Sequence, residues 1–129
     1  MVKVGKIIPN GVSLEKHENK TVVFFTNLGY DVELISPSNI PKTKSPDFIM
    51  CGKAWEMKSP QGDSRVTIEH AFRRAAKQSE NIIIDLRRVT IPTNQARLSL
   101  EKLFRASRRI RNLKVITNEQ KLLEYKKRT

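Results

Sequence analysis

Apolar and polar residues recur along this chain with two periods, which distinguish helices from strands. Residues 13–29 place apolar side chains on one face at helical spacing, and residues 54–58 alternate at every second position. Residues 81–86 are a continuous apolar run, typical of a strand that is buried on both faces. The pattern predicts helices at 13–29, 65–80, 94–111 and 119–127, and strands at 31–36, 47–51, 54–58, 81–86 and 113–117.

The order of these elements predicts an α/β fold in which helices flank a mixed sheet. Residues 1–12 lack a pattern and are expected to form a lead-in segment, so that residues 13–129 make up a single domain. The proline-rich residues 37–46 are expected to be a loop. A turn at Gly52-Lys53 is expected to join the second and third strands into a hairpin.

The first predicted helix carries an acid on its inward face. Ser13 is a suitable N-cap for this helix, and Gly29 is a suitable end. Glu18 falls on the same helical stripe as Leu14, Thr21, Val22, Phe25 and Leu28. An acid among core-facing positions requires a reason, which favours a functional role for Glu18. Glu15 lies one turn away on the same side and is a weaker candidate for that role.

The predicted hairpin reads SPDFIMCGKAWEMKSP and carries further charges. Residues two apart in a strand point the same way, so Glu56 and Lys58 share one face. Trp55 and Met57 share the other face and are expected to pack in the core. Asp47 starts the preceding strand and is expected to lie opposite Lys58 and close to Glu56.

Two carboxylates at such close range repel each other unless one is protonated or a cation lies between them. Oxygen ligands of this kind suit Mg²⁺, which accepts one or two carboxylates and keeps several waters. A bound Mg²⁺ polarises a phosphoryl oxygen and lowers the pKa of a bound water. Lys58 is placed to stabilise the phosphoryl transition state. The pattern therefore favours a metal site that cleaves phosphodiesters, although a hairpin with charges on its solvated face is the simpler interpretation.

Charge adds a second line of evidence. Twenty-five lysines and arginines against thirteen acids give a net charge of +12 and an isoelectric point near 10.2. This excess predicts a polyanionic partner, with nucleic acid ahead of an anionic membrane surface. No apolar run approaches the roughly 18 residues of a spanning helix, so stable membrane anchoring is not expected. Nor does the sequence show a signal-peptide pattern. The single Cys51 excludes an intramolecular disulfide framework and a cysteine-rich zinc site, and is expected to be a core residue.

Basic residues gather in three runs, each of which taken alone would be an ordinary solvated surface. Together, without compensating acids, they are better explained as a surface that follows a phosphate backbone. The same surface is suited to an acidic protein partner. The runs comprise Arg73, Arg74 and Lys77; Arg87 and Arg88; and Arg105, Arg108 and Arg109, with Arg97, Lys102 and Arg111 nearby.

Two resemblances sharpen these expectations. Pro46-Asp47, a gap of eight residues and then Glu56-x-Lys58, within this order of elements, resembles the PD-(D/E)xK nuclease superfamily. The stretches HEN…VVFFTNLGYDVELI, SPDFIMCGKAWEMKSPQG and TIEHAFRRAAKQSENIIIDLRR resemble the C-terminal tRNase toxin domains of contact-dependent growth-inhibition and related polymorphic toxin systems. The fold so implied is a restriction-endonuclease-like αβββαβ core followed by a helix, a strand and a helix.

The closer resemblance also implies a site and a function. The implied catalytic residues are Glu18, Asp47, Glu56 and Lys58, the three acids being the implied ligands of Mg²⁺ or Mn²⁺. Ser59, Thr67 and Gln78 match positions near the site, and His70 lies on the following helix, where contact with substrate is possible. The implied substrate is tRNA, and the implied partner is a cognate immunity protein. Such domains are delivered from a larger secreted or surface protein and act in the cytoplasm of the target cell.

Other interpretations stay open at this stage. A DNA endonuclease of the same superfamily would carry the same four residues, and a nucleic-acid-binding module without catalysis would share the charge. His17 and His70 are interpreted as surface or packing residues rather than general bases. Trp55 is interpreted as a core residue rather than a platform for stacking bases.

Overall fold

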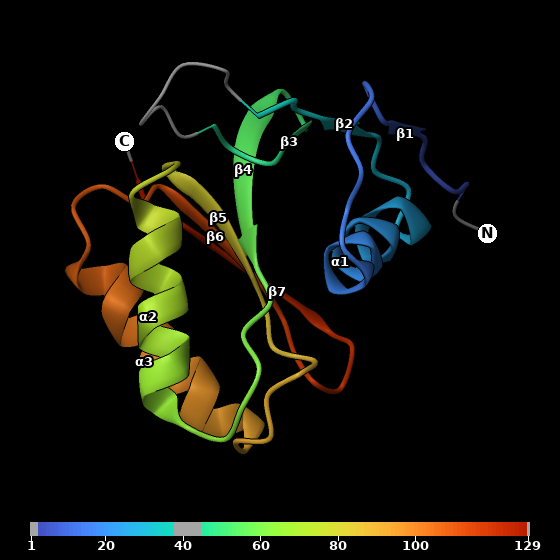
Figure 1. Ribbon diagram of the computed structural model, residues 1–129. Helices are drawn as coiled ribbons and strands as arrows, with labels where there is room; N and C mark the ends of the chain where they lie inside the picture. The colour runs from blue at the N-terminus through green and yellow to red at the C-terminus, as the bar shows by residue number, and fades with distance from the viewer. Residues whose placement is uncertain (1–2, 38–44, 129) are drawn as a thin grey trace.

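One mixed sheet organises the molecule (Figure 1). The computed structural model describes residues 3–37 and 45–128, and in these ranges seven strands lie in the order of the chain, with three helices packed against them. The strands are β1 (Ile7–Ile8), β2 (Val32–Leu34), β3 (Phe48–Met50), β4 (Lys53–Lys58), β5 (Asn81–Asp85), β6 (Asn112–Ile116) and β7 (Leu122–Lys126). The helices are α1 (Lys16–Asn27), α2 (Arg65–Ala76) and α3 (Thr93–Ala106).

Strand directions follow from the connections. Short turns join β3 to β4 and β6 to β7, and both pairs are antiparallel, as is β2 with β3. Strands β4, β5 and β6 run parallel because α2 and α3 provide the crossovers that parallel neighbours need. Strand β1 pairs in parallel with β2. The predicted mixed α/β class is confirmed.

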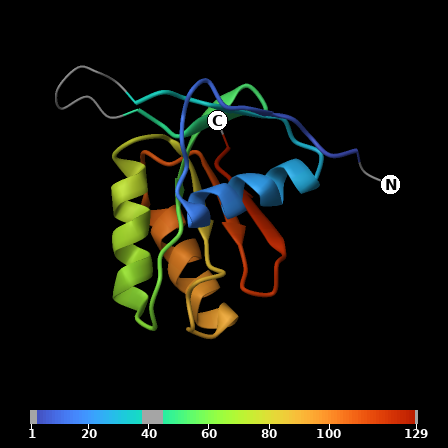
Figure 2. The ribbon, with the colours of Figure 1, turned by 45° about the vertical axis from the view of Figure 1, so that its right-hand side comes forward.

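Helices cover both faces of the sheet (Figures 1 and 2). Helices α2 and α3 pack on one face of the sheet and α1 packs on the other. One apolar core lies under α2 and α3, and a second lies under α1. Ile82 and Ile84 of β5 belong to the core under α2 and α3, whereas Ile83 belongs to the core under α1. All three are fully buried, and each contributes about 1.5–3 kcal/mol of hydrophobic stabilisation. The prediction of a strand buried on both faces is confirmed.

The alternation predicted for β4 is also observed. Trp55 and Met57 pack in the core under α1, and the indole Nε1–H of Trp55 donates to the carbonyl of Met50 at 2.9 Å. Because side chains alternate along a strand, Glu56 and Lys58 project from the opposite face, the one on which α2 lies. This alternation places an acid and a lysine next to the crossover helix.

The hairpin turn lies one residue earlier than predicted. Cys51 and Gly52 have φ of +54° and +72°, the pair of positive values that a two-residue hairpin turn with the right twist requires. Lys53 therefore belongs to β4, and Phe48 pairs with Trp55. Extending this register by one residue places Asp47 beside Glu56, so the expectation that Asp47 lies opposite Lys58 was wrong. Cys51 is exposed in the turn and is not a core residue.

Other boundaries also differ from prediction: α2 ends at Ala76 instead of residue 80, and α3 ends at Ala106 instead of residue 111. The N-cap of α1 is Glu15 instead of Ser13, while Gly29, at φ +99°, follows the helix end as expected. Residues 119–127 contain strand β7, not a helix, so the C-terminal part is helix, strand, strand. The predicted lead-in contributes β1 to the sheet. Of the predicted loop at 37–46, residues 38–44 lie outside the described residues.

Across the described ranges, every helix is too short or too polar to span a bilayer.

Candidate active site

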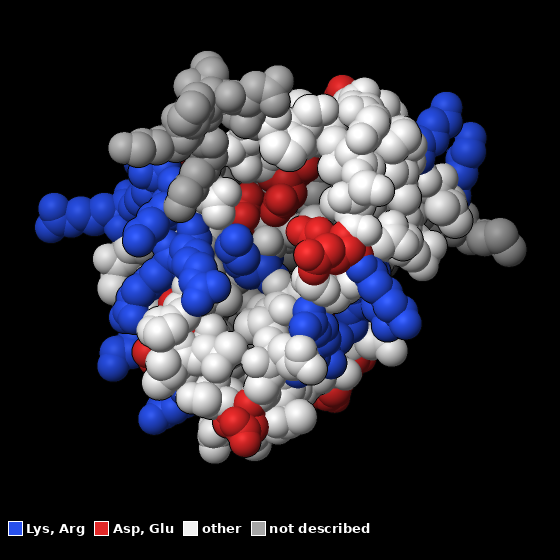
Figure 3. Space-filling view, in the orientation of Figure 1, with Lys and Arg blue, Asp and Glu red and all other residues white. Residues whose placement is uncertain are grey.

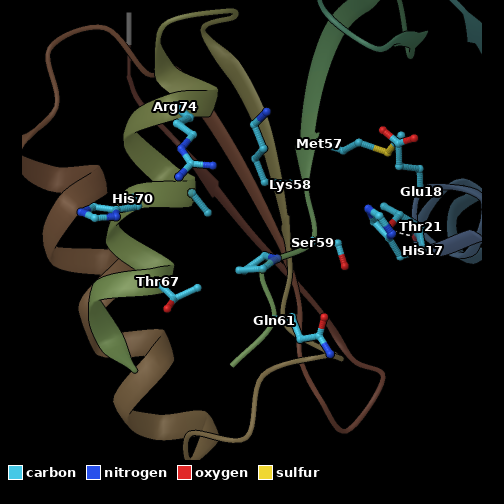
Figure 4. A pocket seen from close by; sticks show the side chains of 12 residues that line it. His17, Glu18, Thr21, Met57, Lys58, Ser59, Gln61, Thr67, His70 and Arg74 are labelled. Atoms are coloured by element: carbon cyan, nitrogen blue, oxygen red, sulfur yellow. Dashed lines mark hydrogen bonds between the residues drawn. The ribbon is translucent and has the colours of Figure 1, made fainter. Parts of the chain in front are cut away.

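A cavity of about 430 Å³ opens where β4 ends, between α1 and α2 (Figure 4). Its walls combine the N-terminal half of α1, the last residues of β4, the loop that follows and one side of α2. The residues that line it are His17, Glu18, Thr21, Met57, Lys58, Ser59, Pro60, Gln61, Thr67, His70, Ala71 and Arg74. The β4-to-α2 crossover and the packing of α1 together bring these side chains to one place.

Lys58 and Glu56, which their spacing predicts to share one face of β4, form an ion pair. The Nζ atom of Lys58 lies 3.1 Å from Oε2 of Glu56. The glutamate side chain is 4% exposed, whereas the lysine is 28% exposed and reaches the cavity. The lysine therefore links a buried carboxylate to a solvent-filled space.

Asp47 lies directly next to this pair. Its Oδ2 accepts a hydrogen bond from the backbone N–H of Met57 at 2.8 Å, which fixes the carboxylate at the edge of β4. Asp47 and Glu56 do not line the cavity themselves. They lie behind its wall and connect to it through Lys58 and Met57.

Burial and mutual repulsion perturb both acids. Desolvation by burial, followed by the charge of Asp47, raises the pKa of Glu56 to about 7, against the opposing effect of Lys58. Burial also raises the pKa of Asp47 above its ordinary value, while the hydrogen bond from Met57 opposes the rise. Two carboxylates with raised pKa at the edge of a cavity are typical of functional sites.

The acid pair fits a divalent cation. Oε1 of Glu56 is buried and has no hydrogen-bond partner among the described residues, which leaves one oxygen of a carboxylate unsatisfied. A cation between Asp47 and Glu56 would satisfy that oxygen and relieve the repulsion that raises both pKa values. Two carboxylate ligands completed by water are characteristic of Mg²⁺ and Mn²⁺ sites. Within residues 3–37 and 45–128, no three His, Cys, Asp or Glu side chains cluster as a larger metal centre would need.

Glu18 reaches the cavity but does not join the acid pair. In Figure 4 it lies with His17 and Thr21 on one side of the end of β4, and Lys58 lies on the other. Its Oε1 accepts a hydrogen bond from the backbone N–H of Glu15 at 3.0 Å, which caps α1. Its charge contributes to the raised pKa of Asp47, so it lies within electrostatic range of the acids.

The supporting residues divide into two groups. Ser59, Thr67 and His70 line the cavity as expected, whereas Gln78, beyond the end of α2, does not. Thr21 and Gln61 also line it and were not singled out from the sequence as site residues. Thr21 was assigned to the inward face of α1, and that assignment already placed it beside Glu18.

Basic side chains flank the acids. Figure 3 shows acidic atoms in the middle of this face, with lysines and arginines on both sides of them. Arg74 lines the cavity, and Arg73 and Lys77 are exposed on the same helix. Arg109 donates to the carbonyl of Lys77 at 3.3 Å, which brings the basic run after α3 next to α2. Arg105 and Arg108 are exposed in that run.

Arg87, Arg88 and Arg97 have internal partners, and Arg87 pairs with Asp85 at 2.8 Å. Arg97 forms an ion pair with Glu101 at 2.8 Å on α3. Arg88 donates hydrogen bonds to the carbonyl of Ser59 and to Oε1 of Gln61, and these two bonds stabilise the loop that follows β4. Arg88 therefore shapes the cavity wall in addition to contributing charge.

Fold and site together define a small mixed α/β domain with two acids and a lysine beside a basic cavity. The sequence model of the contact-dependent growth inhibition CdiA C-terminal domain matches residues 44–122, more than half of the chain. The chain therefore belongs to this family. Asp47, Glu56 and Lys58 fall inside the matched range, and Glu18 falls outside it.

A solved relative supports the fold. The chain is similar to a protein in the "CdiA-CT/CdiI toxin and immunity complex from Burkholderia pseudomallei", with a TM-score of 0.67 and 20% sequence identity over 98% of both chains. A comparison of the sequence with curated proteins found no match. The similarity extends over the whole domain, including β1 and β7.

Proposed function

We propose that this domain is a metal-dependent endoribonuclease of the PD-(D/E)xK type that cleaves tRNA as the toxin of a contact-dependent growth-inhibition system. The observation that carries the proposal is the buried carboxylate of Glu56, which has one unsatisfied oxygen, Asp47 beside it and Lys58 at 3.1 Å. Holding the buried carboxylate of Glu56 beside the half-buried Asp47 is costly for stability. The retention of this pair next to a basic cavity is best explained by a chemical role.

Lys58 is the group that reaches substrate. Its ammonium lies between the buried acids and the cavity, where it would hold a non-bridging oxygen of the scissile phosphate. Negative charge accumulates on those oxygens in the transition state, so a fixed ammonium stabilises the transition state more than the ground state. The ion pair with Glu56 holds the ammonium in place.

Asp47 and Glu56 would hold the cation, with Glu18 of α1 within electrostatic range of Asp47. A divalent ion bound there supplies a Lewis acid for the phosphoryl oxygen and a more acidic water. The chain itself orients the acids: the backbone N–H of Met57 fixes Asp47, and the neighbours in the sheet bury Glu56. His70 and Thr67 on α2 are within the same cavity and are suited to contact the sugar or phosphate groups flanking the cleaved bond.

The tRNA substrate follows from the resemblance of residues 45–62 and 67–88 to tRNase toxin domains. A net charge of +12 supports a nucleic-acid substrate in general. The solved relative is a toxin and immunity complex, and we propose an acidic immunity protein that covers this cavity. Delivery from a larger surface protein into the target-cell cytoplasm completes the proposal.

The test compares substrates and metals directly. Purified domain is incubated with total tRNA and, separately, with plasmid DNA, in Mg²⁺, Mn²⁺ or EDTA. Cleavage of tRNA alone, lost in EDTA, supports the proposal, and cleavage of plasmid identifies a DNA endonuclease. Binding with a steep salt dependence but no product in either reaction identifies a non-catalytic module. Lys58→Ala serves as the inactive control, with circular dichroism to establish that it is folded.

A further inference from the structure

Asp85 is a buried carboxylate that the proposed reaction does not use. It ends β5 and is 2% exposed. The hydroxyl of Thr21 donates to its Oδ2 at 2.7 Å, and Nη2 and Nε of Arg87 donate to Oδ2 at 2.8 Å and Oδ1 at 3.0 Å. The carboxylate is therefore fully satisfied, and it fixes one edge of the arginine.

Arg87 is held on two further sides. Its Nη2 donates to the carbonyl of Lys20 at 3.0 Å, and its guanidinium carbon lies 5.2 Å from the centre of the Phe24 ring. Its Nη1 makes no hydrogen bond to any residue of the described ranges, and the side chain is 23% exposed. An arginine immobilised in this way loses little conformational entropy when it binds an anion.

The arginine lines a second cavity, of about 590 Å³, which adjoins the first. His17 and Ser59 line both cavities, so the two share a wall at the end of β4. Charge in the second cavity is strongly positive, because Asp85 is the single acid in its lining and Arg87 already pairs with it. The cations that line the cavity are Lys16, Lys20, Arg87 and Arg88.

We propose that the second cavity binds a backbone phosphate adjacent to the cleaved linkage on the same RNA strand. This inference rests on the proposed nuclease function and extends it to a second phosphate. Because the two cavities share His17 and Ser59, a strand whose scissile phosphate meets Lys58 can continue past Ser59 into the second cavity. The remaining Nη1 of the pre-set Arg87 can donate to a phosphate oxygen, and Lys16 and Lys20 add charge from α1.

The variant that tests the proposed phosphate site removes positive charge without changing the buried contacts among Thr21, Asp85 and Arg87. Lys16→Gln combined with Lys20→Gln changes two exposed side chains and leaves the backbone carbonyl that Arg87 uses. The matched control is Lys53→Gln with Lys126→Gln, which removes the same charge from two exposed residues that line neither cavity. Both double variants are expected to fold, as checked by circular dichroism.

Cleavage of tRNA gives the first measurement. The Lys16/Lys20 variant is expected to lose about tenfold in kcat/KM, and the control less than about twofold, since a contact to phosphate is a charge-assisted hydrogen bond. Once the cut nucleotide is mapped, an oligonucleotide with an uncharged methylphosphonate at the neighbouring linkage tests the phosphate itself. The modification should lower the kcat/KM of the wild type about tenfold. It should change the kcat/KM of the Lys16/Lys20 variant little, because that variant has already lost most of the contact. Equal kcat/KM for the two double variants, or an equal methylphosphonate loss in both proteins, would overturn the inference.

Binding separates failure of this inference from failure of the proposed function. Fluorescence anisotropy with labelled tRNA, in the Lys58→Ala background, measures affinity without cleavage. If the wild type cuts nothing but the Lys16/Lys20 change lowers affinity about tenfold, the phosphate site stands and the nuclease proposal fails. If the wild type cuts tRNA and the change alters neither affinity nor rate, the nuclease stands and the phosphate site fails.

Discussion

Neutralising Glu56 is expected to stabilise the fold while it abolishes activity. Burial and Asp47 raise the pKa of Glu56 from 4.5 to about 7. At about 1.4 kcal/mol per pKa unit, keeping this carboxylate ionised in the folded protein costs about 3 kcal/mol at pH 8. That cost is already net of the attraction to Lys58 at 3.1 Å, and Glu56→Gln removes it while placing a buried amide with donors of its own beside the lysine. We expect a net gain of about 1–2 kcal/mol, or about 3–6 °C in Tm.

The gain should depend on pH in a defined direction. The pKa of Glu56 in the unfolded chain is 4.5, and in the folded protein it is about 7. Below pH 4.5 the group is protonated in both states and costs nothing. Between pH 4.5 and about 7 the unfolded chain ionises this group while the folded wild type keeps it protonated, so the wild type loses stability that the glutamine variant keeps, and the loss levels off above pH 7. The advantage of Glu56→Gln should therefore be small at pH 5 and largest near pH 8.

Urea denaturation in EDTA at pH 5, 6, 7 and 8, followed by circular dichroism, measures this difference. Glu119→Gln is the matched control because Glu119 is exposed and forms no ion pair within the described ranges. It should show a small difference from wild type that does not grow towards pH 8. A Glu56→Gln protein that is less stable than wild type at pH 8, or a gain that is independent of pH, would refute the electrostatic reasoning.

Four other perturbations have separable effects. Lys58→Ala should lower tRNA cleavage at least about 100-fold with an unchanged circular dichroism spectrum, and retained cleavage would contradict its role on the phosphate. Millimolar MgCl₂ should raise the Tm of the wild type at pH 8 but not that of Asp47→Asn, and an equal rise in both would place the metal elsewhere. Arg74→Gln should weaken tRNA binding and reduce the slope of log K against log salt by about 0.7–0.9, whereas an unchanged slope would remove Arg74 from the interface. Leu100→Ala should cost about 2–5 kcal/mol in urea denaturation because Leu100 is fully buried, and a cost below about 1 kcal/mol would mean that the core repacks.

Local pattern was sufficient for much of the site. The alternation of β4 assigned Trp55 and Met57 to the core, and Glu56 and Lys58 to the opposite face, without any knowledge of neighbouring strands. The continuous apolar run of β5 likewise indicated burial on both faces. Such assignments succeed because the direction of a side chain in a strand depends on backbone geometry alone.

The pairing of strands was harder to predict from the sequence. The sequence NEQKLLEYK favours a helix by composition, yet residues 122–126 form β7 because β6 offers them a partner strand. Leu123 and Tyr125 pack against the core under α2 and α3, and this burial outweighs helix propensity. The hairpin register shifted because Cys51 adopts a positive φ, which residue type alone does not predict.

The sequence by itself determined which residues carry charge, which faces of β4 and β5 are apolar, and that Asp47, Glu56 and Lys58 lie on one hairpin. Tertiary structure decided that Glu56 is buried with an unsatisfied oxygen, that Glu18 approaches from across β4, and that Asp85 holds Arg87 beside a second cavity. The physical reason is the range of the forces involved. Periodicity is set within a few residues, whereas burial, pKa and cavities depend on elements that are distant in the chain and meet only when the sheet is assembled.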